Sequence, residues 1–283
     1  MTFDTRIHFP QSQGGPNPEA VSRGCGFLFD TLHESMRFHS IPTDTALSET
    51  RNDIKNYPAL LKNLQTAATW LKGCDTGTVF MLGGDCSTDV AIIDKLNAMH
   101  GKGFGFIWID AHADIHVPQG SDSKYFHGMP IRTLLGEGDA AMLAALGTPL
   151  EHRQLCYAGI KSIDAPEADY IRQKKLPVVT AEQINAGNYT VFDAWQKNNG
   201  ITALHIHFDL DALDPADGIT VTYPVGAIRH TAMKEFLAYL YKQGITVGFT
   251  ITEYAPISRN EAEIRRVLEL ISVIVPLPEI LAA

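Results

Sequence analysis

Four polar side chains that could bind a metal ion follow an apolar segment in the middle of the chain. After the apolar residues 104–109, Asp110, His112, Asp114 and His116 occupy alternate positions. A hydrophobic run of this length predicts a parallel strand that is buried on both faces. Because alternate side chains of an extended segment lie on one side, these groups can converge just beyond the strand, where open α/β sheets bind their ligands.

Two further segments have the same layout. Residues 201–208 are apolar apart from one threonine and two histidines, and they lead into Asp209 and Asp211. Residues 78–82 lead into Gly83-Gly-Asp-Cys-Ser, which contains Cys86. Three strands would thus bring carboxylate, imidazole and thiol groups to one edge of a sheet. Carboxylates with a minority of imidazoles suit Mn²⁺ or a related divalent ion better than a structural zinc ion.

The elements that must position these groups are strands alternating with helices, which indicates a parallel sheet covered by helices on both faces. The long polar segment 110–126 is expected to be functional, as such loops inside a domain usually are. Strands are predicted at 5–9, 78–82, 104–109, 153–158, 178–179, 201–208 and 245–251. Helices are predicted at 30–37, 48–72 (broken or restarted at Pro58), 87–99 (capped by Ser87), 130–135, 139–146, 166–173, 191–198, 231–243 and 261–274.

Length and composition restrict the class of protein. The 283 residues fit one large α/β domain spanning 1–283, although length alone would allow two. A net charge of −9 argues against a nucleic-acid-binding surface. No secretory signal and no apolar run long enough to span a bilayer are found. The four cysteines form no CxxC pair, so a soluble cytoplasmic protein with reduced thiols is predicted.

The three motifs, in this order, resemble those of the ureohydrolases, the arginase and agmatinase family. Gly83-Gly-Asp-Cys-Ser is similar to the family's Gly-Gly-Asp-His-Ser, and Asp110-Ala-His-Ala-Asp to its Asp-Ala-His-x-Asp. Phe208-Asp-Leu-Asp-Ala-Leu-Asp-Pro is similar to its Asp-x-Asp-x-x-Asp-Pro segment. The resemblance covers about residues 79–256. It implies a three-layer α/β/α fold with a mostly parallel central sheet, and two Mn²⁺ ions bridged by a hydroxide that attacks a guanidinium carbon.

The resemblance also implies a role for each metal-binding residue. Asp110 and Asp209 would bridge the two ions, and Asp114 would join them on the first ion. The second ion would be completed by one histidine and one further aspartate, and Cys86 stands where the family has a histidine on the first ion. The implied ligands are Cys86, Asp110, His112, Asp114, Asp209 and Asp211.

Four residues outside the ligand set match catalytic or substrate-binding positions of the family. His127 matches a proton-shuttling histidine, and Glu253 matches a glutamate that pairs with the guanidinium group; with Asp114 they form the predicted catalytic residues. Asp164 matches an acidic residue that recognises the substrate's α-amino group. His116 replaces an asparagine that contacts the α-carboxylate in arginases, so it is a predicted substrate-binding residue and equally a candidate donor behind the ligands.

Cys86 is the departure from the family pattern that suggests a particular substrate. A thiolate in place of a neutral histidine would raise the ligand charge from minus four to minus five, weaken Lewis acidity and raise the pKa of the bridging water. Such a centre would suit a less basic guanidine. The chain resembles the N-hydroxyarginine hydrolases of cycloserine (antibiotic) biosynthesis, which implies release of hydroxyurea and ornithine. Residues 221–230 also depart from the family's loop.

Several alternatives stay open at this point. Cys86 could be a buried free thiol, Asp164 an ordinary helix N-cap, and His205 and His207 are expected to be interior histidines and not ligands. The enzyme could instead be an arginase, an agmatinase or another amidine hydrolase. A non-catalytic binding module and a mononuclear zinc deacylase are rivals from other classes. The sequence leaves open the hydroxylation of the substrate and the state of assembly, including a homo-oligomer.

Overall fold

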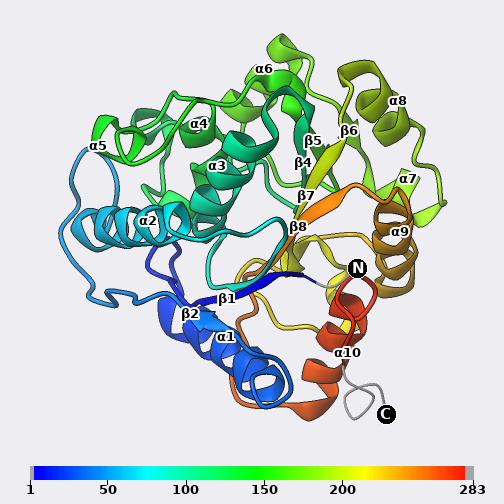
Figure 1. Cartoon of the computed structure of the whole chain (residues 1–283), viewed down its shortest axis with the longest axis horizontal. Helices are drawn as coiled ribbons and strands as arrows, with labels where there is room; N and C mark the ends of the chain where they lie inside the picture. The colour runs from blue at the N-terminus through cyan, green and yellow to red at the C-terminus, as the bar shows by residue number, and fades with distance from the viewer. Residues whose placement is uncertain (1–2, 278–283) are drawn as a thin grey trace.

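The computed structural model of the chain describes residues 3–277, which fold around one eight-stranded sheet (Figure 1). The strand order is β2-β1-β3-β8-β7-β4-β5-β6, and all neighbouring strands pair in parallel. The strands are β1 Thr5–Phe9, β2 His39–Ser40, β3 Val79–Gly83, β4 Phe104–Ile109, β5 Leu155–Ala158, β6 Val178–Val179, β7 Ala203–Asp209 and β8 Thr246–Thr252.

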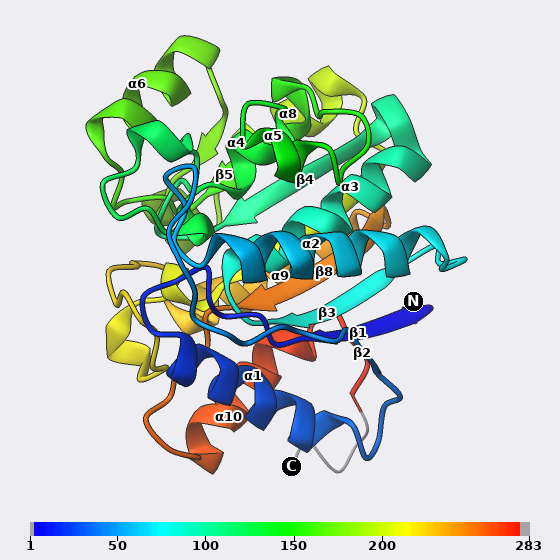
Figure 2. The ribbon, with the colours of Figure 1, turned by 90° about the vertical axis from the view of Figure 1, so that its left-hand side faces the viewer.

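Helices cover both faces of the sheet, so the predicted three-layer α/β/α architecture is confirmed. Figure 2 shows α1 and α10 on one side of β1 and β3, and α2 on the other. The helices are α1 Pro18–Leu32, α2 Tyr57–Lys72, α3 Asp89–His100, α4 Pro130–Leu134, α5 Ala140–Leu143, α6 Ala165–Lys174, α7 Ala181–Asn185, α8 Thr190–Asn199, α9 His230–Lys242 and α10 Glu261–Ile271. Among residues 3–277, none of these helices combines the length and apolar character needed to cross a membrane.

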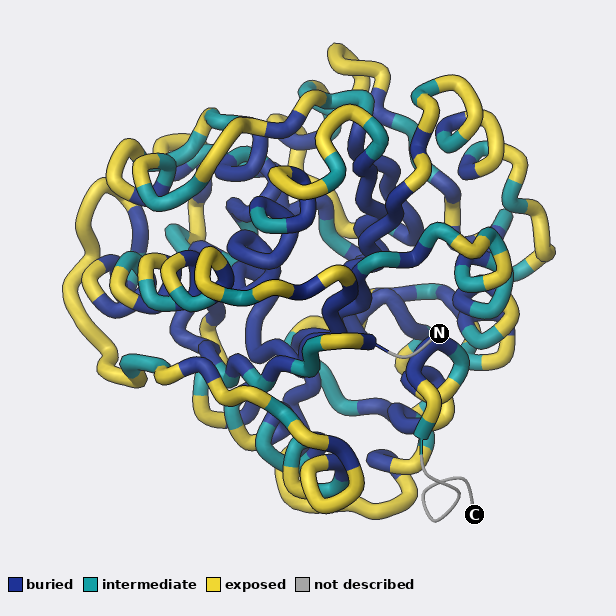
Figure 3. The backbone as a smooth tube through the Cα atoms, viewed as in Figure 1, coloured by how far each residue is buried: buried dark blue, intermediate teal, exposed yellow. Residues whose placement is uncertain are grey.

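The central strands are buried on both faces because their side chains alternate between two hydrophobic cores. In β4, Ile107 and Ile109 pack into the core beneath α1, α9 and α10, whereas Phe106 and Trp108 pack into the core beneath α2 and α3. Figure 3 shows this buried centre surrounded by exposed helices and loops. The prediction of one domain over residues 1–283 stays a prediction, and residues 1–2 and 278–283 lie outside the described part.

The first helix was predicted in the wrong place. The structure has a helix at Pro18–Leu32, not at 30–37. Gly24 and Gly26 weaken the local helical pattern, and only tertiary packing explains the first of them: a Cβ atom on Gly24 would collide with the carbonyl oxygen of Tyr254, whereas one on Gly26 would meet nothing. Packing of α1 against the segment after β8 thus stabilises a helix whose intrinsic helix propensity is low.

Two helix starts also differ from the prediction, and two short elements were not predicted. The helix predicted from residue 48 begins only at Tyr57, with Pro58 in its first turn, where its fixed φ angle is tolerated. Ser87 does not cap the next helix; Asp85 accepts a hydrogen bond from the Ser87 backbone N–H, residues 86–88 form a 3₁₀ turn, and α3 begins at Asp89. Strand β2 and helix α7 were not predicted.

Candidate metal centre

Four neighbouring strands end at the same place and deliver the side chains that the sequence singled out. The order β3-β8-β7-β4 puts their carboxyl ends side by side. Cys86 lies in the 3₁₀ turn after β3, Asp110 follows β4, Asp209 ends β7 and Glu253 follows β8. Since parallel strands end at one edge of the sheet, residues more than a hundred positions apart converge there.

The Cys86 thiol lies among carboxylates and not among apolar side chains alone. It is fully buried, and its Sγ donates a hydrogen bond to Asp209 Oδ2 at 3.0 Å. Ligand atoms of Cys86, Asp209 and Glu253 all lie within 4.8 Å of one another. A thiol that only filled space would not need two buried acids beside it, so this arrangement favours metal ligation.

His112 forms the second part of the cluster. Its Nδ1 lies 2.9 Å from Asp211 Oδ2 and 3.5 Å from Asp110 Oδ1. Backbone N–H groups fix the carboxylates: the N–H of His112 donates to Asp110 at 2.6 Å, that of Asp211 to Asp209 at 2.7 Å, and that of Ala111 to Asp211 at 3.0 Å. These bonds fix three carboxylates in place and leave other oxygen lone pairs available to a metal ion.

Asp114 is turned toward the cluster by an unusual backbone conformation. Its φ angle is +50°, in the left-handed region that costs non-glycine residues about 1–2 kcal/mol. Its side chain is buried, and Oδ2 has no hydrogen-bond partner among the described residues. Burying a carboxylate oxygen without a hydrogen-bond partner costs free energy unless a ligand such as a metal ion binds that oxygen.

The crowding of acids has a clear electrostatic effect. Burial, followed by repulsion from Asp110, raises the pKa of Asp114 well above its usual value. Burial and Asp211 do the same to Asp209, and burial and Asp110 raise the pKa of Asp211 to about 7. Burial and Asp209 also raise the pKa of the Cys86 thiol. Divalent cations would reverse these penalties, so the donor set fits a metal centre.

A cavity of about 250 Å³ lies beside the cluster and is lined by several of the residues predicted to bind substrate. His127 Nδ1 lies 3.5 Å from Glu253 Oε1, and His116 Nε2 lies 3.1 Å from Asp164 Oδ2. Asp164 is also the N-cap of α6, so both of its predicted roles are compatible with the structure. The cavity lining includes His112, Asp114, His116, His127, Asp164 and Tyr223. A larger cavity of about 640 Å³ lies between α6 and α8, and no acidic side chain lines it.

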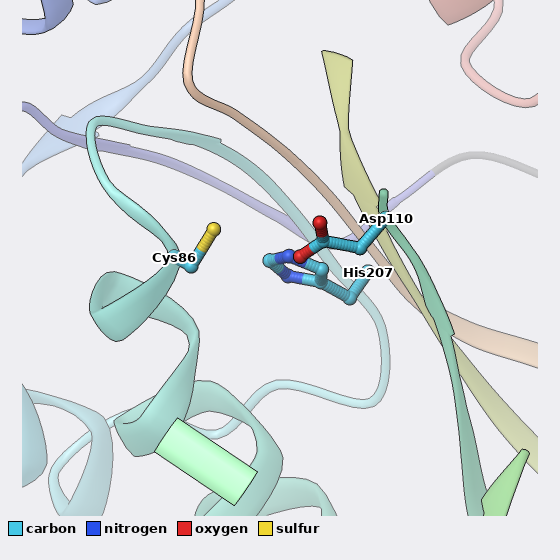
Figure 4. Close-up of side chains that lie close together, drawn as sticks. All are labelled: Cys86, Asp110 and His207. Carbon is cyan, nitrogen blue, oxygen red and sulfur yellow. The ribbon is translucent and has the colours of Figure 1, made fainter. Parts of the chain in front are cut away.

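Two residues near the centre were missed as possible site residues. Tyr223, in the loop that departs from the family, stacks on His127 with ring centroids 6.0 Å apart. His207 is buried, as predicted for an interior histidine, but Figure 4 shows it with Cys86 and Asp110, and their ligand atoms lie within 4.8 Å of one another. The alternation of His207 with Asp209 in one strand was the sequence signal that could have placed both on one face.

Comparisons with known proteins identify the family of the chain. A family model described as the arginase family matches residues 32–273. The arginase of Staphylococcus aureus (strain MRSA252) is 25% identical over 214 residues, covering 73% of this chain and 70% of that protein. The arginase of Bacillus subtilis (strain 168) is 30% identical over 182 residues, covering 62% of this chain and 61% of that protein.

Solved structures give the same result along the whole chain. The crystal structure of Entamoeba histolytica arginase in complex with L-ornithine has a TM-score of 0.86 at 25% identity, covering 98% of this chain and 99% of that one. Formimidoylglutamase of Bacillus subtilis shares the fold alone, with a TM-score of 0.71 at 18% identity, covering 96% of this chain and 88% of that one. The chain therefore belongs to the arginase family of ureohydrolases, hydrolases that act on C–N bonds of linear amidines.

Proposed function

We propose that this protein hydrolyses the guanidino group of N-hydroxy-L-arginine. Water adds its oxygen to the guanidino carbon, the bond from that carbon to the side-chain nitrogen breaks, and hydroxyurea and ornithine are released. The observation that carries the proposal is the position of Cys86, which lies 3.0 Å from Asp209 inside a cluster of carboxylates. The Entamoeba arginase structure that resembles this chain holds L-ornithine, the amino acid product proposed here.

The metal ligands proposed from the sequence are Cys86, Asp110, His112, Asp114, Asp209 and Asp211. Each of them except Asp114 belongs to a group of three described residues whose ligand atoms lie within 4.8 Å of one another, and Asp114 contributes a buried carboxylate oxygen without a hydrogen-bond partner. These side chains would hold the two ions. Two Mn²⁺ ions, when bound, act as Lewis acids and lower the pKa of a shared water so that it can attack at neutral pH.

Glu253 and His127 would handle the charge and the proton of the reaction. Glu253 is buried, takes a left-handed φ angle of +62°, and points its carboxylate into the site, where it can orient a cationic guanidino group. Burial opposes protonation of His127, but its close contact with Glu253 at 3.5 Å and the negative charges of Glu253 and Asp85 together outweigh burial and raise the pKa of His127. A histidine with a raised pKa keeps its proton to higher pH than a free imidazole and can protonate the departing amine.

Cys86 favours the hydroxylated guanidine over arginine itself. On binding a metal ion the thiol would lose its proton, so five ligands would be anionic: Cys86, Asp110, Asp114, Asp209 and Asp211. Stronger anionic donation weakens the Lewis acid and makes the nucleophile harder to form. A substrate that is less basic than arginine, and more easily attacked, offsets this loss.

Arginine hydrolysis is the second candidate. It is favoured by the arginases among the relatives and by a cluster in which every predicted ligand except Cys86 has the family's residue type. Agmatine and other amidines are further candidate substrates, because Asp164 is exposed and its contact with a substrate α-amino group is itself a proposal. A cytoplasmic location and a homo-oligomer stay predictions.

The test is a side-by-side measurement of kcat/KM for L-arginine and N-hydroxy-L-arginine with Mn²⁺-loaded protein, with ornithine as the product assayed. We expect a large preference for the hydroxylated substrate. A preference for arginine would overturn the proposal in favour of an arginase with an unusual ligand. Absence of ornithine from both substrates would leave another amidine or a binding protein.

A further inference from the structure

His207 has one ring nitrogen that is buried and has no partner. Its side chain is completely buried, and Nε2 makes no hydrogen bond with any described residue. Ligand atoms of Cys86, Asp110 and His207 lie within 4.8 Å of one another, and Figure 4 shows the three side chains pointing toward one another. A buried polar atom left without a partner beside two donors of a metal cluster calls for an explanation.

The other ring nitrogen determines what this free nitrogen can do. His207 Nδ1 lies 2.9 Å from Asp89 Oδ2, in the first turn of α3. Burial opposes ionisation of Asp89, but attraction to His205 and hydrogen bonds from both histidines keep its pKa below the usual value. Because a carboxylate can only accept, Nδ1 donates, and Nε2 of a neutral ring then carries a lone pair.

The ring of His207 is also held rigidly. It stacks on Trp108 with centroids 3.4 Å apart and an interplanar angle of 6°. Trp108 Nε1 in turn donates a hydrogen bond to Asp110 Oδ2 at 2.9 Å. One indole thus positions both the imidazole and a predicted metal ligand. A histidine held by a carboxylate through one nitrogen, with the other free, is the usual arrangement of a metal-binding imidazole.

We infer that His207 Nε2 is an additional ligand of the metal ion that Cys86 and Asp110 hold. This inference rests on the metal centre of the proposed function and adds a residue that the predicted ligand set lacks. The centre would then have two histidine ligands, His112 on one side and His207 on the other. A neutral nitrogen donor beside the Cys86 thiolate would restore the imidazole that the cysteine displaces.

His205 provides a matched control. It lies on the same face of β7, is equally buried, and shares Asp89 Oδ2 through its Nε2 at 2.7 Å. Its free nitrogen, Nδ1, packs against the backbone of β8, where a Cβ atom on Gly248 would collide with it. His205 therefore shares the Asp89 network with His207 but does not face the metal centre.

The experiment compares Mn²⁺ binding by the wild-type protein, His207→Asn and His205→Gln. Asparagine can keep the bond from the Nδ1 position to Asp89, and glutamine can keep the bond from the Nε2 position, so each variant removes the free nitrogen and keeps the bond to Asp89. His207→Asn also removes the ring that stacks on Trp108. We expect His207→Asn to weaken binding of one Mn²⁺ ion by more than about 100-fold, beyond the range typical of residues that only support a ligand, and His205→Gln to leave binding unchanged. Thermal melting of the metal-free proteins verifies that the variants fold.

A second measurement needs no variant. Pulsed EPR of the wild-type protein, with its histidines labelled with ¹⁵N, should detect two ligating histidine nitrogens and not one. One nitrogen, or equal weakening by the two variants, would overturn the inference while leaving the proposed hydrolase intact. Wild-type protein that binds no Mn²⁺ would overturn both the inference and the metal centre.

Discussion

Asp114 and Glu253 show how single residues of this chain depart from regular structure where the site requires it. Both have positive φ angles, +50° and +62°, and both come shortly after buried strands. A left-handed residue turns its side chain away from the direction that a continuing strand would give. Such strain persists only where the surrounding structure fixes it, and it is concentrated at functional sites.

Cys86→His tests whether the thiolate sets the substrate preference. With a neutral ligand in place of the anion, the Lewis acid should become stronger. We expect the ratio of kcat/KM for arginine to that for N-hydroxyarginine to rise by at least about tenfold, equivalent to about 1.4 kcal/mol. Metal content serves as the control. An unchanged ratio at full Mn²⁺ occupancy would show that the preference arises elsewhere, for example in the loop of Tyr223.

His127→Asn tests the proton donor and its pH dependence. The pKa of His127 is raised, against burial, by Glu253, and kcat should fall as the pH rises through that pKa because the ring then loses its proton. We expect the variant to lose about 10²- to 10⁴-fold in kcat and to lose this alkaline limb, with Mn²⁺ content unchanged. His152→Asn, at a histidine of the larger cavity, should keep wild-type kinetics. An alkaline limb that survives in His127→Asn belongs to another group.

Helix α1 illustrates how one element is specified by its contacts with another. It begins at Pro18, where the missing N–H costs nothing, and has Gly24 and Gly26 in its middle. Arg23 donates hydrogen bonds to the carbonyl oxygen of Pro256 at 3.0 and 3.1 Å, which ties the helix to the segment after β8. That segment begins with Glu253, so the contact with α1 helps to fix the backbone that carries Glu253.

A pair of glycine substitutions separates the two roles of glycine in α1. Gly24→Ala would push the helix from Tyr254 and should destabilise the protein by about 1–3 kcal/mol. Gly26→Ala meets open space in the same helix and should stabilise it by about 0.5–1 kcal/mol. Chemical denaturation measures both. Equal effects of the two variants would show that α1 does not pack this closely in solution.

At the scale of the whole molecule, the metal centre is created by the order of strands in the sheet. β3, β8, β7 and β4 are neighbours, although their order along the chain is β3, β4, β7, β8. The crossovers that bring them together carry the helices of both outer layers. Because unfolding would separate Cys86, Asp110, Asp209 and Glu253, metal binding and folding should be linked.

Metal loading should therefore raise the melting temperature. At a free Mn²⁺ concentration 100 times Kd each bound ion stabilises the protein by about 2.7 kcal/mol, which for a chain of 283 residues corresponds to an increase of roughly 5 °C per ion. Chelation with EDTA should reverse it. Asp209→Asn, which removes a charge from the centre of the cluster, should melt at a temperature that Mn²⁺ changes little. A wild-type melting temperature that Mn²⁺ does not change would argue against the centre.

Local patterns along the chain were enough to predict the class of fold and several residues of the cluster. Continuous apolar segments that end in acids and histidines are typical of a buried parallel sheet with polar groups at one edge. Those local patterns correctly gave β1, β4 and most of β3 and β7, and the cluster contains the predicted Cys86 and Asp110.

How these residues face one another depends on contacts between strands and layers that no local pattern encodes. The left-handed turns at Asp114 and Glu253, the contact of Cys86 with Asp209, and the free Nε2 of His207 depend on neighbouring strands and on packing between layers. The same holds for α1, where Gly24 is explained by the backbone of Tyr254, more than two hundred residues away. Periodicity along a chain reports which face is buried, but not which side chain another strand places opposite it.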